Sequence, residues 1–177
     1  KSKVLYGLFQ AKKAIAKEDV CILVEGYTDV ISLHQKGVEN VVASSGTALT
    51  VEQIKLIKRF TNNIILALDG DAAGQKAAIR GVDLILKEDL NVKVVAFPEG
   101  EDPDSFAKSK PSEELKKYIQ QNAVDFITYK CNLLLSSAGN DPILRAQVIK
   151  DVVSSIALIP DAINRNVYAQ SASKILD

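Results

Sequence analysis

The feature that most constrains the fold is an alternation of short apolar runs with amphipathic segments across the first 97 residues. Four runs rich in β-branched residues are typical of buried strands: VCILV (20–24), VVAS (41–44), NIILAL (63–68) and NVKVVAF (91–97). Before and between these runs, apolar residues recur at helical intervals, in residues 4–17, 28–36, 50–60 and 72–87. Single helices between strands indicate βαβ units, so we predict an α/β fold: a mostly parallel four-stranded sheet with helices on both faces.

Beyond residue 110 the pattern changes to helical spacing alone. We expect four helices there, at 112–121, 123–136, 142–158 and 161–176. The chain therefore divides into a basic N-terminal helical segment (1–17), an α/β domain (18–110) and a small all-α helical bundle (111–177). Apolar residues make up 47% of the chain, which is enough for a packed core and excludes a disordered or collagen-like protein.

The charges balance overall but are unevenly distributed. The chain has 22 basic and 22 acidic residues, which argues against strong nucleic-acid binding by this chain alone. The first 17 residues nevertheless hold five lysines and no acid, whereas four acids lie within residues 99–104. Two cysteines and one histidine are too few for a four-ligand Cys/His zinc site, and we expect both thiols to be buried and reduced in a cytoplasmic protein.

Other features bear on location and completeness. No apolar run approaches the length of a membrane span and no signal peptide opens the chain, so we expect no membrane partner. The chain begins at Lys1 and contains no Met, so we expect it to be a piece of a longer protein.

Carboxylates follow two of the predicted strands. Glu25 comes directly after the first strand, and Asp69 and Asp71 come directly after the third. Ligands of parallel sheets bind at the carboxyl ends of the strands, and alternate residues of an extended segment point the same way. Clustered carboxylates repel one another unless a cation lies between them, and an all-oxygen site suits Mg²⁺. Alternatively, Asp-Gly-Asp is a turn in which Asp71 caps the next helix.

Two more segments fall on the same predicted edge. Asp102 and Asp104 follow the fourth strand and are available for a second cation, while Asp102 is also placed to cap a short helix beginning at Pro103. Gly46 and Thr47 follow the second strand, where backbone N–H groups and a hydroxyl can bind a phosphate. The simpler alternative for Gly46 and Thr47 is a turn leading to a helix capped at residue 50.

Several motifs together resemble the catalytic core of bacterial DNA primases of the DnaG type. They are KSKVLYGL, EGYTDV, SSGTALT, DGDAAG and GEDPD, in this order, and the tail NRNVYAQSASKILD is similar to the helical end of the primase polymerase domain. Glu25 and Asp69-Gly70-Asp71 match the pattern of the wider TOPRIM fold. Thr28 departs from the Met found in many primases, at a position that is not a ligand.

The resemblance implies a DNA-directed RNA polymerase of the bacterial cytoplasm. Such an enzyme makes short RNA primers on single-stranded DNA from ribonucleoside triphosphates at the replication fork. By the same resemblance, Glu25, Asp69 and Asp71 would hold Mg²⁺, for which Mn²⁺ would substitute, and Asp102 and Asp104 would complete the acidic cluster. Lys1 lies in a basic segment that in the family is near the nucleotide and template groove. We expect the nucleotide and template to be bound there by the following residues: Lys1, Lys3, Gly46 and Thr47.

Primases also carry a zinc-binding domain, a basic template-binding subdomain and a domain that binds the replicative helicase. None of these fits in 177 residues, so zinc and the helicase contact are expected only outside this chain. We expect the isolated fragment to be monomeric and to bind metal, with little primer synthesis of its own. Two alternatives stay open: a TOPRIM nuclease or topoisomerase fragment, and a non-catalytic TOPRIM binding module.

Overall fold

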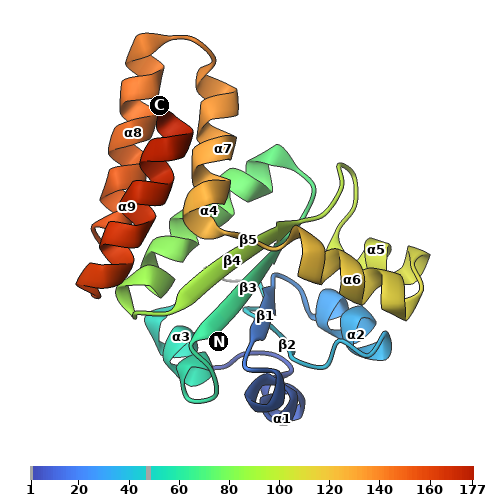
Figure 1. Ribbon diagram of the computed structural model, residues 1–177. Helices are drawn as coiled ribbons and strands as arrows, with labels where there is room; N and C mark the ends of the chain where they lie inside the picture. Colours follow the sequence, from blue (N-terminus) through green and yellow to red (C-terminus); the bar gives the residue numbers. More distant parts are fainter. Residues whose placement is uncertain (1, 47–48) are drawn as a thin grey trace.

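A computed structural model of the chain describes residues 2–46 and 49–177, apart from the side chains of 72–74, 76–78 and 80. Its centre is a sheet with the strand order β2-β1-β3-β4-β5 (Figure 1). The strands are β1 (Cys21–Val24), β2 (Val41–Ala43), β3 (Asn63–Leu68), β4 (Asn91–Ala96) and β5 (Val124–Asp125). The first four are parallel, and β5 runs antiparallel to β4.

The four parallel strands agree with the prediction, and β5 corrects it. Residues 123–136 were expected to form one helix, but Val124 and Asp125 pair with Val94 and Lys93 of β4. Two residues are too few to show a strand pattern in the sequence. They form a strand only because they pair with the edge of β4. The helix begins only at residue 126, where the Asp125 side chain accepts a hydrogen bond from the Thr128 backbone N–H at 2.9 Å.

Helices cover both faces of the sheet and continue beyond it. They are α1 (Leu8–Glu18), α2 (Tyr27–Gln35), α3 (Val51–Lys58), α4 (Ala72–Lys87), α5 (Pro103–Ser109), α6 (Ser112–Asn122), α7 (Phe126–Ala138), α8 (Pro142–Ile156) and α9 (Ala162–Leu176). Along β1, β2 and β3, alternate side chains enter two buried clusters. Leu23 of β1 joins the cluster under α1, α3 and α4, whereas its neighbour Ile22 joins the one under α2, α5 and α6.

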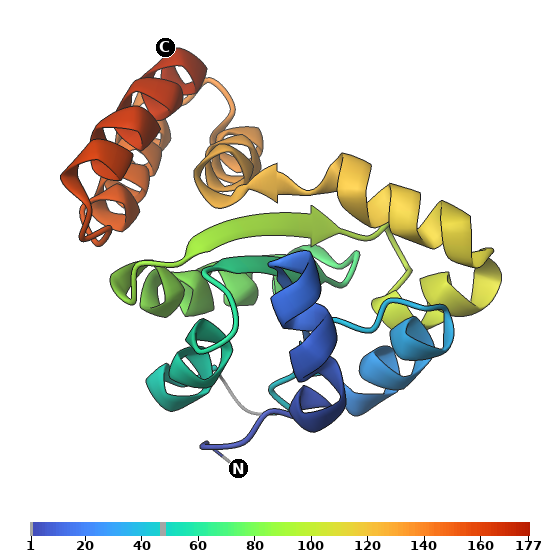
Figure 2. The same cartoon turned by 60° about the horizontal axis from the view of Figure 1, so that its bottom comes forward.

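The last three helices pack together beside the β4–β5 edge (Figure 2). A buried polar chain joins them to α4. The Lys130 ammonium of α7 donates to the Ser155 hydroxyl of α8 at 2.7 Å and to the Asp151 carbonyl at 3.0 Å. Ser155 in turn donates to the Asp83 carboxylate of α4 at 2.8 Å. The bundle is thus held to the sheet layer by hydrogen bonds as well as by apolar contact.

The division of the chain at residue 110 stays a prediction. Helix α6, which lies on the bundle side of that division, packs on the sheet, and its Tyr118 hydroxyl donates to the Ala96 carbonyl of β4 at 2.8 Å. Both thiols, Cys21 and Cys131, are buried and unpaired, as predicted. Across the part of the chain that the structure describes, every helix is too short or too polar to cross a bilayer.

Candidate metal centre

The carboxyl ends of the parallel strands bring three acidic segments to one edge of the sheet. Glu25 follows β1, Asp69 follows β3, and the acidic loop 99–104 follows β4. Strands β1 and β3 are hydrogen-bonded neighbours, so Glu25 and Asp69 follow adjacent strands. The Ser45 backbone N–H after β2 donates to the Glu25 carbonyl at 3.1 Å, so a fourth segment reaches the same edge.

Gly70 holds the Asp-Gly-Asp turn against the acidic loop. Its backbone N–H donates to the Glu101 carbonyl at 2.9 Å. A Cβ atom on residue 70 would lie 1.9 Å from the Pro98 carbonyl oxygen, a distance that no side chain tolerates. The glycine therefore permits the close approach that places the acids of two loops side by side.

Asp69 lies at the electrostatic centre of this edge. Its pKa is raised from 3.8 to about 6, first by burial and then by the negative charges of neighbouring acids. These neighbours are Glu25, Asp29, Asp102 and Asp71, in that order of effect. Three of the other acids predicted as metal ligands, Glu25, Asp71 and Asp102, therefore act on Asp69, and so does Asp29.

Asp29 is the acid that the sequence interpretation missed. It lies in the first turn of α2, is only 7% exposed, and accepts a hydrogen bond from the Gly26 N–H at 2.9 Å. Burial raises its pKa, as do the charges of Asp102, Asp104 and Glu25, while the Gly26 hydrogen bond lowers it. The available signal was its place four residues after Glu25, because the first turn of a helix following a strand faces that strand's end.

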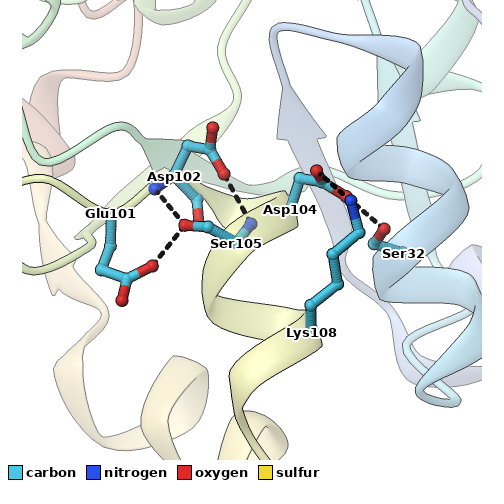
Figure 3. Close-up of polar contacts among 6 residues, drawn as sticks. All are labelled: Ser32, Glu101, Asp102, Asp104, Ser105 and Lys108. Carbon is cyan, nitrogen blue, oxygen red and sulfur yellow. Dashed lines mark hydrogen bonds and ion pairs between the residues drawn. The ribbon is translucent and has the colours of Figure 1, made fainter.

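Asp102 has the capping role that the sequence predicted, and its role as a cation ligand stays a prediction. It caps α5, accepting a hydrogen bond from the Ser105 N–H at 2.6 Å, while the Ser105 hydroxyl accepts one from the Asp102 N–H at 3.0 Å (Figure 3). The Ser105 hydroxyl also donates to the Glu101 carboxylate. The charge of Asp102 nevertheless reaches Asp69, so the cap and a place in the acidic cluster are compatible.

Asp104 is engaged differently from the other acids. Its carboxylate lies between the Lys108 ammonium, at 2.6 Å, and the Ser32 hydroxyl of α2, both of which donate to it (Figure 3). These two hydrogen bonds, that from Lys108 first, lower the pKa of Asp104. It is therefore an ionised carboxylate with a positive partner already in place.

The donor set suits a hard divalent cation. All the clustered groups are carboxylates, which favour Mg²⁺ or Mn²⁺ over zinc, and their mutual repulsion on Asp69 is the field that a cation would relieve. Among the residues described, no three acidic, histidine or cysteine side chains stand close enough to form a coordination group.

The predicted nucleotide-binding residues are only partly described. Lys1 and Thr47 lie outside the described residues. Lys3 is exposed, in a segment fixed to α3 because the Thr50 hydroxyl donates to the Ser2 carbonyl at 2.6 Å. Gly46 is exposed with a φ of 73°, directly after Ser45. Exposed rings lie nearby: Tyr27, two residues after Glu25, makes an edge contact with Tyr6.

Comparisons with known proteins agree with this architecture. A family model described as Toprim-like matches residues 22–107. The chain is 39% identical to the DNA primase of Clostridium acetobutylicum over 171 residues, which are 96% of this chain and 28% of that protein. A DNA primase domain from Pseudomonas aeruginosa aligns with a TM-score of 0.86 at 33% identity, covering 99% of this chain and 56% of that one. A DnaG primase catalytic domain bound to single-stranded DNA aligns with a TM-score of 0.84 at 30% identity, covering 98% and 57%.

The parallel sheet and its acidic edge lie almost entirely within the segment that is similar to the Toprim-like family model. Over almost all of its length the chain is similar to DnaG-type bacterial DNA primase catalytic cores, so the resemblance drawn from its motifs is confirmed. The predicted fold class, a TOPRIM-type sheet followed by a helical bundle, is confirmed with it. The chain spans less than a third of the length of the curated relatives it matches.

Proposed function

We propose that this chain is the catalytic core of a primase, a nucleotidyltransferase that joins ribonucleotides into short RNA primers on a single-stranded DNA template. The observation that carries the proposal is the field at Asp69, where four other carboxylates act on one side chain. That field lies at the strand-end edge of a chain similar to primase cores over nearly its whole length. The groups that act on Asp69 are carboxylates, which fits a reaction that needs positioning and charge.

Glu25, Asp69 and Asp71 would hold divalent cations, with Mg²⁺ as the physiological ion and Mn²⁺ as a substitute. Such ions stabilise the attacking 3′-oxygen and the leaving pyrophosphate in an in-line displacement. Asp102 and Asp104 supply further negative charge, and Asp29 adds its carboxylate from the first turn of α2. Gly70 keeps the two acidic loops in register, and the α5 cap fixes the backbone of Asp102.

Template and nucleotides would approach over Lys3 and Gly46, with Lys1 and Thr47 in the same segments. In support, a similar primase domain was solved with single-stranded DNA bound. The zero net charge of this chain indicates that it binds template weakly by itself. Contact with a replicative helicase and a site of action in the bacterial cytoplasm belong to the same proposal. We also propose that residues 18–110 and 111–177 act as separate catalytic and helical parts, as the sequence predicts.

Primer synthesis by a chimaera tests the function. The chain would replace the matching segment of the Clostridium acetobutylicum primase, with single-stranded DNA, ribonucleotides and Mg²⁺ supplied. We expect primers from this chimaera, a loss on the order of 100-fold or more with Asp69→Asn/Asp71→Asn, and no loss with Glu39→Gln/Glu113→Gln, which removes the same charge from exposed positions. The 177-residue chain alone should make few primers.

Two results would contradict the proposal. Priming by the Asp69→Asn/Asp71→Asn chimaera at the level of the unsubstituted one would separate these acids from the chemistry. Metal-dependent DNA cleavage by the chain, in place of synthesis by the chimaera, would favour the TOPRIM nuclease alternative.

A further inference from the structure

Lys108 places a positive charge inside the acidic edge, and primer synthesis as proposed above gives it no role. Its ammonium lies 2.6 Å from Oδ2 of Asp104, one turn away along α5. The other oxygen, Oδ1, accepts a hydrogen bond from the Ser32 hydroxyl of α2 (Figure 3). Both carboxylate oxygens of Asp104 are therefore occupied by donors from the protein itself.

The two partners of Asp104 differ in how firmly the fold holds them. Ser32 is buried, 6% exposed, in the contact between α2 and α5. The Asp104 side chain is 21% exposed, whereas that of Lys108 is 68% exposed. An exposed lysine stem has many rotamers, and an exposed ion pair contributes little to stability. The ammonium can therefore leave without disturbing the helix or the Ser32 hydrogen bond that fixes the carboxylate.

Lys110 offers a comparison two residues further along. Its ammonium pairs with Glu114 of α6 at 2.7 Å, an acid that does not belong to the strand-end cluster. Lys110 thus has the same charge and nearly the same place in sequence, but a different partner. The contact with the acidic edge is a property of Lys108, set by its spacing of four residues from Asp104.

We propose that Lys108 is a tethered counter-cation for Asp104, which neutralises this carboxylate in the metal-free chain and yields it to a divalent ion when one binds. A doubly charged ion attracts a carboxylate more strongly than an ammonium at the same distance, so the exchange runs toward the metal. Lys108 is then a positioning residue that lowers the affinity of the cation at Asp104, and Ser32 keeps the carboxylate oriented during the exchange. Lys108 has this role only if the edge binds cations, as the proposed primase function requires.

Mn²⁺ titration of the 177-residue chain, followed by calorimetry and by the electron paramagnetic resonance of free Mn²⁺, tests this role. We expect Lys108→Met to tighten Mn²⁺ binding at the site that includes Asp104 about two- to fivefold. Lys108→Arg, which keeps the charge, should bind like the wild type, and so should Lys110→Met. Adding Asp104→Asn to Lys108→Met should remove the gain, because the freed carboxylate is then absent.

Three results would contradict the role of Lys108 without affecting the proposed function. They are unchanged or weaker Mn²⁺ binding in Lys108→Met, an equal gain in Mn²⁺ affinity in Lys110→Met, or a gain in affinity that survives Asp104→Asn. The second would show a general effect of charge, and the third would exclude Asp104 as the site of exchange. A wild-type chain that binds no Mn²⁺ would instead contradict the proposed function itself, so the two failures are distinguishable.

Discussion

At the scale of single residues, two positions explain how five carboxylates lie close together at the strand-end edge and what that costs. Asp69 carries an electrostatic cost, since burial and four neighbouring charges raise its pKa to about 6. Gly70 allows the approach that creates this cost, because any Cβ there would collide with the Pro98 carbonyl. The metal-free chain is therefore strained electrostatically at the place where the proposed function needs a cation.

Asp69→Asn should stabilise the metal-free chain, and by more at neutral than at acid pH. Folded Asp69 keeps its proton up to about pH 6, whereas the unfolded side chain loses it near 3.8. The folded state thus binds more protons within this window, and stability is lost as the pH rises through it. Because the side chain is partly exposed, we expect a gain of about 1–2 kcal/mol at pH 7.5 and little difference at pH 4.

Urea unfolding in a metal chelator at the two pH values measures this difference. A stabilisation of the same size at both, or a destabilisation at pH 7.5, would show that Asp69 does not carry the repulsion.

At the scale of elements, local signals predicted the starts of α3 and α8. Thr50 and Gln53 form the expected capping box, with the Gln53 N–H donating to the Thr50 hydroxyl at 3.2 Å. Pro142 begins α8 behind the Asp141 cap. The features that the sequence did not predict depend on contacts between distant parts of the chain. β5 exists only through its pairing with β4, and the engagement of Asp104 by Ser32 joins residues 72 positions apart.

The candidate site could also be predicted only in part from the sequence. Strand-end placement predicted that Glu25, Asp69 and Asp71 lie at one edge, because the βαβ pattern indicates parallel strands. That β1 and β3 are neighbours is shown only by the structure. Asp29 was missed, because its burial against the cluster depends on the angle at which α2 leaves the sheet. The assignment of Glu25, Asp69 and Asp71 as metal ligands stays a prediction.

The attachment of the bundle to the sheet gives a prediction at the scale of elements. Ser155→Ala should destabilise the chain by about 1–3 kcal/mol, because it removes one partner of the buried Lys130 ammonium and the donor to Asp83. The neighbouring Ser154 is exposed and bonds only within its own helix, to the Lys150 carbonyl, so Ser154→Ala should change stability by less than about 0.5 kcal/mol. Equal effects of the two substitutions in urea unfolding would exclude the polar chain as an attachment.

At the scale of the whole molecule, charge is separated along the chain. The net charge of zero combines a lysine-rich start with acids gathered at the strand ends. A protein of this balance is suited to binding cations at one edge while depending on other surfaces for nucleic acid. The neutral total is therefore compatible with a primase core.

The central claim is that Glu25, Asp69 and Asp71 form a divalent-cation site. Mn²⁺ titration of the 177-residue chain tests it most directly, with the wild type compared with Asp69→Asn/Asp71→Asn and with the charge-matched Glu39→Gln/Glu113→Gln. We predict that the first double substitution weakens Mn²⁺ binding on the order of tenfold or more and that the second leaves it unchanged. Mn²⁺ affinity retained in Asp69→Asn/Asp71→Asn would contradict the account.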